Sequence, residues 1–197
     1  MIKIFLETGK KTTSEYVFIR TLLRVLGISE SLYQIECVNG KDNLPHAANT
    51  FIGNTLQGGT NLLIFDADTE QNQGGFTQRK QELTETLQRL GIEAEIFLFP
   101  NNQDDGDFET LVEQLAQTER HQRFFDCYGD YENCLGADYI APNRKGKLFT
   151  YISAMPMSKT QRDKLGQGEW HFDDAQYWNL ESPALEALKG FLRSWFG

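Results

Sequence analysis

Three carboxylates stand directly after two apolar stretches that have the character of strands. Glu7 follows the stretch at 2–6, and Asp66 and Asp68 follow the continuous apolar run at 61–65. In open α/β sheets, ligands bind outside the carboxyl ends of the strands. Residues two apart share one strand face, so the two aspartates can converge on one point. If the two strands are neighbours, we expect all three carboxylates to meet at one edge of the sheet.

Carboxylates that lie this close together repel one another unless a cation neutralises them or one of them is protonated. Hard oxygen ligands with open coordination positions suit Mg²⁺, which keeps several waters and bridges to substrate phosphates. The pattern therefore favours a Mg²⁺ site, with Mn²⁺ as the alternative ion. A DxD motif alone is also typical of the polar loop that follows any buried strand, and a single Glu in a loop looks the same.

The elements that must position these residues alternate between strands and helices. Strands are expected at 2–6, 33–37, 61–65 and 95–99, and helices at 14–27, 43–56, 77–90 and 108–115. Ser14 is the expected N-cap of the first helix, and Gly91 closes the third. This alternation predicts an α/β fold with a mostly parallel four-stranded sheet flanked by helices.

The alternation is lost in the last third of the chain. Residues 118–178 are rich in aromatic side chains, show no strand pattern and contain a basic loop at 143–147. One last helix is expected at 183–196. We therefore expect an α/β domain at 1–117 and a helical, partly irregular C-terminal extension at 118–197 that packs on it.

Composition narrows the class of protein. The chain has 197 residues, with 19 Lys and Arg against 28 Asp and Glu and a net charge of −9, whereas a broad phosphate-binding surface needs clustered basic residues. No apolar run approaches the roughly 20 residues of a membrane span, and the N-terminus is charged too early for a signal peptide. Cys37, Cys127 and Cys134 form no CxxC pair and are expected to be reduced and buried. These features favour a cytoplasmic protein that has no membrane contact.

The acidic motifs resemble those of the Toprim superfamily, the catalytic domain shared by topoisomerases, bacterial primases and OLD-type nucleases. That family has a Glu after its first strand, then a helix, and later an apolar strand that runs into DxD. Here these are Ile4-Phe-Leu-Glu7 and Leu63-Ile-Phe-Asp66-Ala-Asp68. Glu15, which opens the first helix, is similar to the Glu that follows the first motif in OLD-type nucleases.

Three further stretches resemble the small stand-alone Toprim-like proteins of unknown function. They are Phe97-Leu-Phe-Pro100, the helix start Gly106-Asp-Phe-Glu109, and the phrase from Tyr177 to Pro183. The resemblance covers about residues 1–115 well and the remainder loosely. It departs from the family where Thr8 separates Glu7 from the glycine that usually follows it directly.

The resemblance implies a Toprim-like (Rossmann-like) fold and a Mg²⁺-dependent, nuclease-like enzyme that acts on phosphodiester bonds. Asp66 and Asp68 would hold the ion. Glu7 would be a further ligand or the catalytic general acid for the leaving oxygen, which requires a raised pKa. Glu15 and Glu70 would serve a second ion or an outer shell, although surface charges explain both residues about as well.

The implied substrate is a nucleic acid or the phosphate of a nucleotide. Lys10 and Lys11 would contact its phosphates, or they are two exposed lysines in a turn. The basic loop at 143–147 has the same two interpretations, phosphate contact or a solvated loop. These residues include no ATPase, zinc-binding or DNA-gate segment, so substrate capture would fall to a partner protein such as an ATPase.

Other interpretations of the acidic residues remain open. Haloacid-dehalogenase phosphatases carry DxD on the first strand, with Thr or Val where this chain has Glu70. GT-A glycosyltransferases need an opening nucleotide-binding strand and a larger acceptor domain. For the run at 104–109 we expect Asp107 to cap a helix and Glu109 to favour its N-terminal end. A Toprim-like fold could also be a non-catalytic binding or regulatory module of a nucleic-acid or defence system, with acidic loops that contact proteins.

Overall fold

The computed structural model describes residues 1–72 and 74–196. Four strands form one all-parallel sheet in the order β2-β1-β3-β4. Their bounds are β1 (Ile2–Leu6), β2 (Tyr33–Cys37), β3 (Thr60–Asp66) and β4 (Glu95–Phe99). The α/β class with a parallel four-stranded sheet is thus confirmed, and the arrangement is consistent with a Rossmann-like fold. Since β1 pairs with β3, the strands that precede the three predicted carboxylates are neighbours, as expected.

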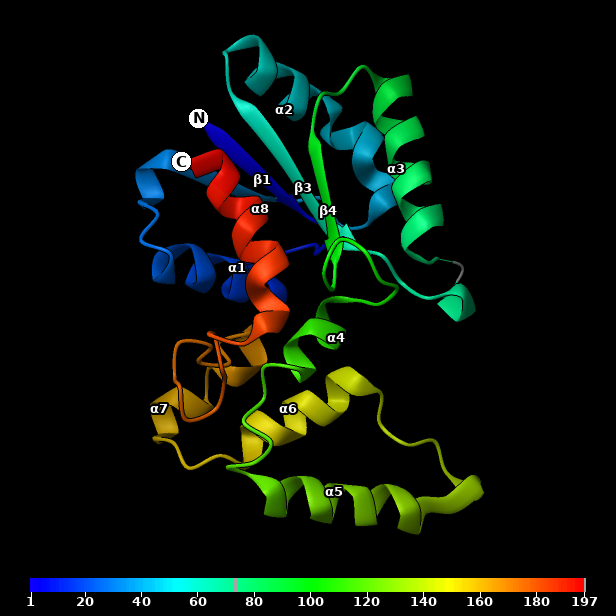
Figure 1. Ribbon diagram of the computed structural model, residues 1–197, viewed down its shortest axis with the longest axis vertical. Helices are drawn as coiled ribbons and strands as arrows, with labels where there is room; N and C mark the ends of the chain where they lie inside the picture. Colours follow the sequence, from blue (N-terminus) through cyan, green and yellow to red (C-terminus); the bar gives the residue numbers. More distant parts are fainter. Residues whose placement is uncertain (73, 197) are drawn as a thin grey trace.

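Helices cover both faces of the sheet (Figure 1). On one face lie α2 (Leu44–Leu56) and α3 (Phe76–Leu90); on the other lie α1 (Ser14–Val25) and α8 (Glu186–Phe196). Successive strand residues point to opposite faces. Phe5 therefore packs in the α2–α3 layer, where its ring stacks on Phe51, whereas Ile4 and Leu6 pack in the α1–α8 layer.

The remaining helices follow β4 and lie mostly beyond the carboxyl edge of the sheet. They are α4 (Phe108–Glu113), α5 (Gln122–Leu135), α6 (Arg144–Ala154) and α7 (Lys159–Arg162). Short 3₁₀ turns lie at Glu30–Leu32, Lys41–Asn43, Glu70–Asn72, Gly136–Asp138, Leu165–Gln167 and Pro183–Leu185. Within the described residues, no helix is long and apolar enough to cross a membrane.

Two local predictions are corrected at helix starts. Thr13, not Ser14, is the N-cap of α1, because its backbone is extended and its hydroxyl accepts a hydrogen bond from the Tyr16 N–H. The expected basic loop at 143–147 is wrong. Asn143 caps α6 by accepting a hydrogen bond from the Gly146 N–H at 2.9 Å, so the basic residues that follow it form the first turns of a helix.

The aromatic residues of the last third share a core with the sheet. Trp170, Phe172 and Trp178 are buried in the same cluster as Phe18 of α1 and Ile4 of β1. The Trp178 indole N–H donates to the Trp170 carbonyl at 2.8 Å, so the one polar atom of that ring is satisfied inside the core.

The cysteines differ from expectation in their burial. Cys127 and Cys134 are exposed on α5, and Cys37 at the end of β2 is half-buried. All three are free thiols. The expectation of buried cysteines is therefore wrong. Tertiary packing decides which face of α5 meets the body of the protein, and the positions of the cysteines in the sequence do not reveal it.

Candidate acidic site at the carboxyl edge of the sheet

The ends of β1 and β3 bring Glu7 and Asp66 into contact. Oε2 of Glu7 accepts a hydrogen bond from the backbone N–H of Asp66 at 3.1 Å. Oδ1 of Asp66 accepts one from the backbone N–H of Phe108, the first residue of α4, at 2.8 Å. The fold therefore joins the first strand, the third strand and α4 at one point through these two carboxylates.

Glu15, in the first turn of α1, and Glu109, in the first turn of α4, extend this acidic group. Burial and the charges of Glu7 and Glu109 raise the pKa of Glu15 to about 8. Oε1 of Glu15 is buried and makes no hydrogen bond. An orphaned carboxylate oxygen of this kind is costly unless a proton or a cation serves it.

The pKa values of Asp66 and Glu7 are raised as well. Burial, followed by the charges of Glu15, Glu7 and Glu109, raises the pKa of Asp66 well above its ordinary value. Burial also raises the pKa of Glu7, against the opposing hydrogen bond from the Asp66 backbone. We call Glu7, Glu15, Asp66 and Glu109 the acidic group, and three of its members hold protons more tightly than they would in water.

Glu109 is the member of the acidic group that the sequence did not place there. Its expected setting is correct, because Asp107 caps α4 by accepting a hydrogen bond from the Thr110 N–H at 2.7 Å and Glu109 lies in the first turn. The fold adds a further contact, since the start of α4 turns back onto Asp66. In the sequence, Glu109 shows only as an acidic residue two positions after a helix cap. Its favourable place at the start of a helix already explains it, so nothing pointed to the acidic group.

Asp68 lies beside the acidic group but has a cation of its own. Its carboxylate accepts a hydrogen bond from the guanidinium of Arg79 on α3, and the Arg79 side chain is only 4% exposed. A Cβ on Gly74 would lie 2.5 Å from the Cβ of Asp68, so a glycine is needed where the loop after β3 folds back on this residue. The buried guanidinium therefore neutralises Asp68, whereas Asp66 faces other carboxylates.

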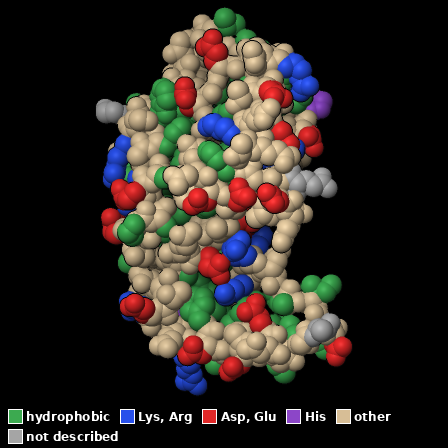
Figure 2. All heavy atoms as spheres, turned by 45° about the vertical axis from the view of Figure 1, so that its right-hand side comes forward, with side chains coloured by type: hydrophobic (Ala, Val, Ile, Leu, Met, Phe, Trp, Pro, Cys, Tyr) green, Lys and Arg blue, Asp and Glu red, His purple; other side chains and the backbone are tan. Residues whose placement is uncertain are grey.

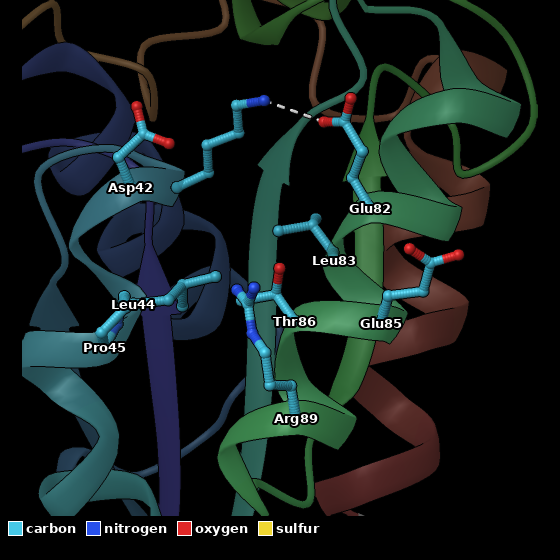
Figure 3. Close-up of a pocket in the computed structure, with 9 residues that line it drawn as sticks. Asp42, Leu44, Pro45, Glu82, Leu83, Glu85, Thr86 and Arg89 are labelled. Carbon is cyan, nitrogen blue, oxygen red and sulfur yellow. Dashed lines mark hydrogen bonds and ion pairs between the residues drawn. The ribbon is translucent and has the colours of Figure 1, made fainter.

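A pocket of about 280 Å³ lies between the start of α2 and the second half of α3 (Figure 3). Its wall carries an ion pair between Lys41 and Glu82, with Nζ and Oε2 2.8 Å apart. Glu82 also contacts Nη1 of Arg79 at 3.0 Å. A chain of ion pairs, Lys41–Glu82–Arg79–Asp68, thus links this pocket to Asp68, which lies beside the acidic group.

The basic residues that the sequence suggests as phosphate contacts lie in two different settings. Lys10 and Lys11 are exposed on the loop between β1 and α1, and within residues 1–72 and 74–196 neither of them makes an ion pair. The basic residues that open α6 pair with acids of α4. Nζ of Lys145 lies 3.1 Å from Oε1 of Glu109, while Arg144 and Lys147 both contact Glu113.

Lys145 is therefore the basic residue of α6 that reaches the acidic group. Its side chain is 62% exposed, whereas that of its partner Glu109 is 13% exposed. Its charge also acts to lower the pKa of Glu15. Glu70 lies exposed on the short turn after β3 and is not among the charges that act on the acidic group.

The residues present can be tested against the metal ion that the sequence implies. In the part of the chain that the structure describes, no group of three or more His, Cys, Asp or Glu side chains is already spaced to hold an ion. The acidic group nevertheless consists entirely of carboxylates, and the buried Oε1 of Glu15 lacks a partner. The donor chemistry fits Mg²⁺ or Mn²⁺, and ligation requires the carboxylates to leave their present partners and draw together.

Comparison with known proteins identifies a protein family. The sequence matches the family described as "Protein of unknown function (DUF3226)" over residues 13–197. No curated protein and no solved structure matches the chain. The matched segment includes Glu15, Asp66 and Glu109 and begins after Glu7. Because the match spans most of its length, the chain belongs to the DUF3226 family.

Proposed function

We propose that the protein is a Mg²⁺- or Mn²⁺-dependent enzyme that acts on phosphodiester bonds in the manner of a nuclease. The observation that carries the proposal is the partly buried group of Glu7, Glu15 and Asp66, in which Glu7 contacts the Asp66 backbone and all three pKa values are raised. Buried carboxylates that repel one another persist only when protons or a cation neutralise them. The resemblance of the Glu and DxD motifs to the Toprim superfamily supports the same site.

Asp66, Glu7 and Glu15 are the proposed ligands, and Asp68 would join them where Arg79 releases its carboxylate. When bound, the ion stabilises the negative charge that develops on the phosphoryl oxygens. Glu15 can hold a proton near neutral pH, because its pKa is raised to about 8. The pKa of Glu7 is raised in the same direction. Whichever of the two does not ligate the ion can serve as the general acid for the leaving oxygen.

The substrate class that we propose is a nucleic acid or the phosphate of a nucleotide. Lys145 pairs with Glu109 and has a largely exposed side chain, so we propose it as the residue best placed to contact a substrate phosphate. Lys10 and Lys11 lie on the loop that connects Glu7 to α1 and can add further contacts. Since the chain has a net charge of −9, we propose that a partner protein, such as an ATPase, helps to capture a polyanionic substrate.

A cleavage screen with matched variants tests this proposal. Plasmid, single-stranded DNA and RNA are incubated with the protein in Mn²⁺ or Mg²⁺, and products are followed on gels. We expect metal-dependent cleavage that Glu7→Gln and Asp66→Asn abolish and that Glu70→Gln, an exposed control, leaves unchanged. Cleavage that Glu7→Gln and Asp66→Asn leave intact, or that persists in EDTA, contradicts the proposed site.

A non-catalytic binding or regulatory module is the second candidate. The observation that favours it is that Arg79 already pairs with Asp68 and Lys145 with Glu109. The protein's own basic residues therefore neutralise part of the negative charge at this edge of the sheet. In that case the acidic loops would contact a partner protein. Divalent ions would then leave the melting temperature of the wild type unchanged, whereas an operating metal site would raise it.

A further inference from the structure

The segment at 122–140, which comprises α5 and the turn after it, lies at the end of the molecule farthest from α2 and α3 (Figure 1). We call this segment the acidic arm. The side chains of Phe124 and Phe125 contact the ring of Tyr151 on α6, with centroids 5.4 and 5.1 Å away. These rings attach the beginning of the arm to the body of the protein.

The apolar stripe of the arm continues past this attachment. Tyr128 and Tyr131 follow Phe124 at helical spacing, and Tyr128 is the last of them to be buried. Beyond it Leu135 is half-buried, but three large apolar side chains are exposed, 47% for Tyr131, 68% for Tyr139 and 98% for Ile140. Figure 2 shows hydrophobic side chains at the surface of this lowest part of the molecule. Large exposed apolar side chains gathered at one end of a molecule are typical of a binding surface.

The charge of the arm is predominantly negative, and Arg123, at its beginning, is its one basic residue. Residues 124–143 contain no Lys or Arg, and their four acids are Asp126, Asp130, Glu132 and Asp138. Among the described residues none of these four makes an ion pair. The arm therefore presents uncompensated negative charge beside exposed aromatic and aliphatic groups.

The combination of negative charge and exposed apolar groups indicates which kind of partner can bind the arm. Nucleic acid and anionic lipid surfaces carry the same sign of charge and are repelled. A second copy of the arm placed face to face would oppose four carboxylates with four more, and like charges across an interface cost several kcal/mol. An apolar face flanked by Lys and Arg satisfies both features of the arm at once.

We propose that the acidic arm is a docking surface for a partner protein that presents a Lys- and Arg-rich amphipathic helix. The apolar face of that helix covers Tyr131, Tyr139 and Ile140, and its basic flanks meet the four carboxylates of the arm. This surface is separate from the acidic group at the sheet edge, and the inference does not depend on the enzymatic proposal.

Peptide binding tests the proposal directly. The probe is a fluorescent Leu/Lys amphipathic helix of about 18 residues, roughly five turns, and its counterpart is a Leu/Glu helix of the same length. We expect the Leu/Lys helix to bind the wild type, more weakly as salt rises. The double variant Tyr139→Ser/Ile140→Ser should weaken binding at least about tenfold. Leu56→Ser, which changes an 82% exposed apolar residue on α2, should leave binding unchanged.

A second variant separates charge from apolar contact. Asp130→Lys/Asp138→Lys reverses the charge of the arm and should also weaken binding of the Leu/Lys helix, with the melting temperature unchanged because both residues are exposed. Equal affinity of wild type and Tyr139→Ser/Ile140→Ser for the probe would overturn the proposal, as would equal binding of the Leu/Glu helix. A concentration-dependent dimer in light scattering that Ile140→Ser abolishes would make a second copy the occupant, and would also overturn it.

Discussion

Gly168 packs directly against the backbone of Thr13, the N-cap of α1. A Cβ on Gly168 would lie 2.2 Å from the Thr13 carbonyl carbon and 2.5 Å from the Ser14 nitrogen. The C-terminal third of the chain therefore supports the first turn of α1, which carries Glu15. Ion pairs of Arg20 with Glu169 and Arg24 with Asp173 continue this contact along the helix.

Gly168→Ala should destabilise the protein more than another glycine substitution of equal backbone strain. Gly58→Ala is the matched control, because its φ of +74° is close to the +79° of Gly168 but no atom lies within 4 Å of its Cβ position. The strain alone costs about 1 kcal/mol, and the clash at Gly168 should add about 1–3 kcal/mol. Urea denaturation of both variants measures the difference; equal losses would mean that the contact with Thr13 adjusts freely.

Arg79 should contribute far more to stability than an exposed arginine in a comparable ion pair. Arg79→Gln leaves Asp68 and Glu82 without the guanidinium that both contact. Removing one member of a buried pair costs about 3–5 kcal/mol, and since the two acids are partly exposed we expect about 2 kcal/mol. Arg24→Gln removes an exposed pair with Asp173 and should cost less than about 1 kcal/mol. Similar losses of unfolding free energy in the two variants would refute this role.

Much of this arrangement follows from the sequence for simple physical reasons. Residues 62–65 are all apolar because β3 is buried on both faces. Parallel neighbours end at the same edge, which is why Glu7 and Asp66 meet although 59 residues separate them. Strand pattern and topology together thus sufficed to place two of the three predicted carboxylates in contact.

What the sequence did not reveal depends on long-range contacts. The start of α6 has a helix cap at Asn143, but the basic residues and Gly146 behind it are equally typical of a loop. Nothing local indicates that Lys145 meets Glu109, or that Arg79 lies close to Asp68. Those pairs arise when α3, α4 and α6 pack around the sheet edge, and a single sequence carries no pattern for such packing.

Stability should fall as the pH rises from about 4.5 to about 8 when divalent ions are removed. Glu15 has a raised pKa of about 8 in the folded protein against 4.5 ordinarily, so in this range the folded state holds a proton that the unfolded state releases. Its contribution is fully present below the unfolded pKa and is lost as the pH passes the folded one. The raised pKa values of Glu7 and Asp66 act in the same direction.

Urea denaturation in EDTA at about pH 5.5 and about pH 8.5 measures this dependence. Glu15→Gln removes the titrating group and keeps a similar shape, so its stability should change less between the two conditions. A wild-type protein that becomes more stable toward pH 8.5, or a Glu15→Gln profile identical to that of the wild type, would show that Glu15 is not held protonated by its surroundings.

The metal proposal is tested most directly by titrating the wild type, Asp66→Asn and Glu70→Gln with Mn²⁺ and Mg²⁺ in a calorimeter, and by following the melting temperature in parallel. We expect saturable binding and a rise in melting temperature for the wild type and for Glu70→Gln, and loss of both in Asp66→Asn. Binding should strengthen at higher pH, because the ion displaces protons from the acidic group. A wild type that neither binds these ions nor gains stability from them, or an Asp66→Asn variant that responds as the wild type does, would contradict the proposal.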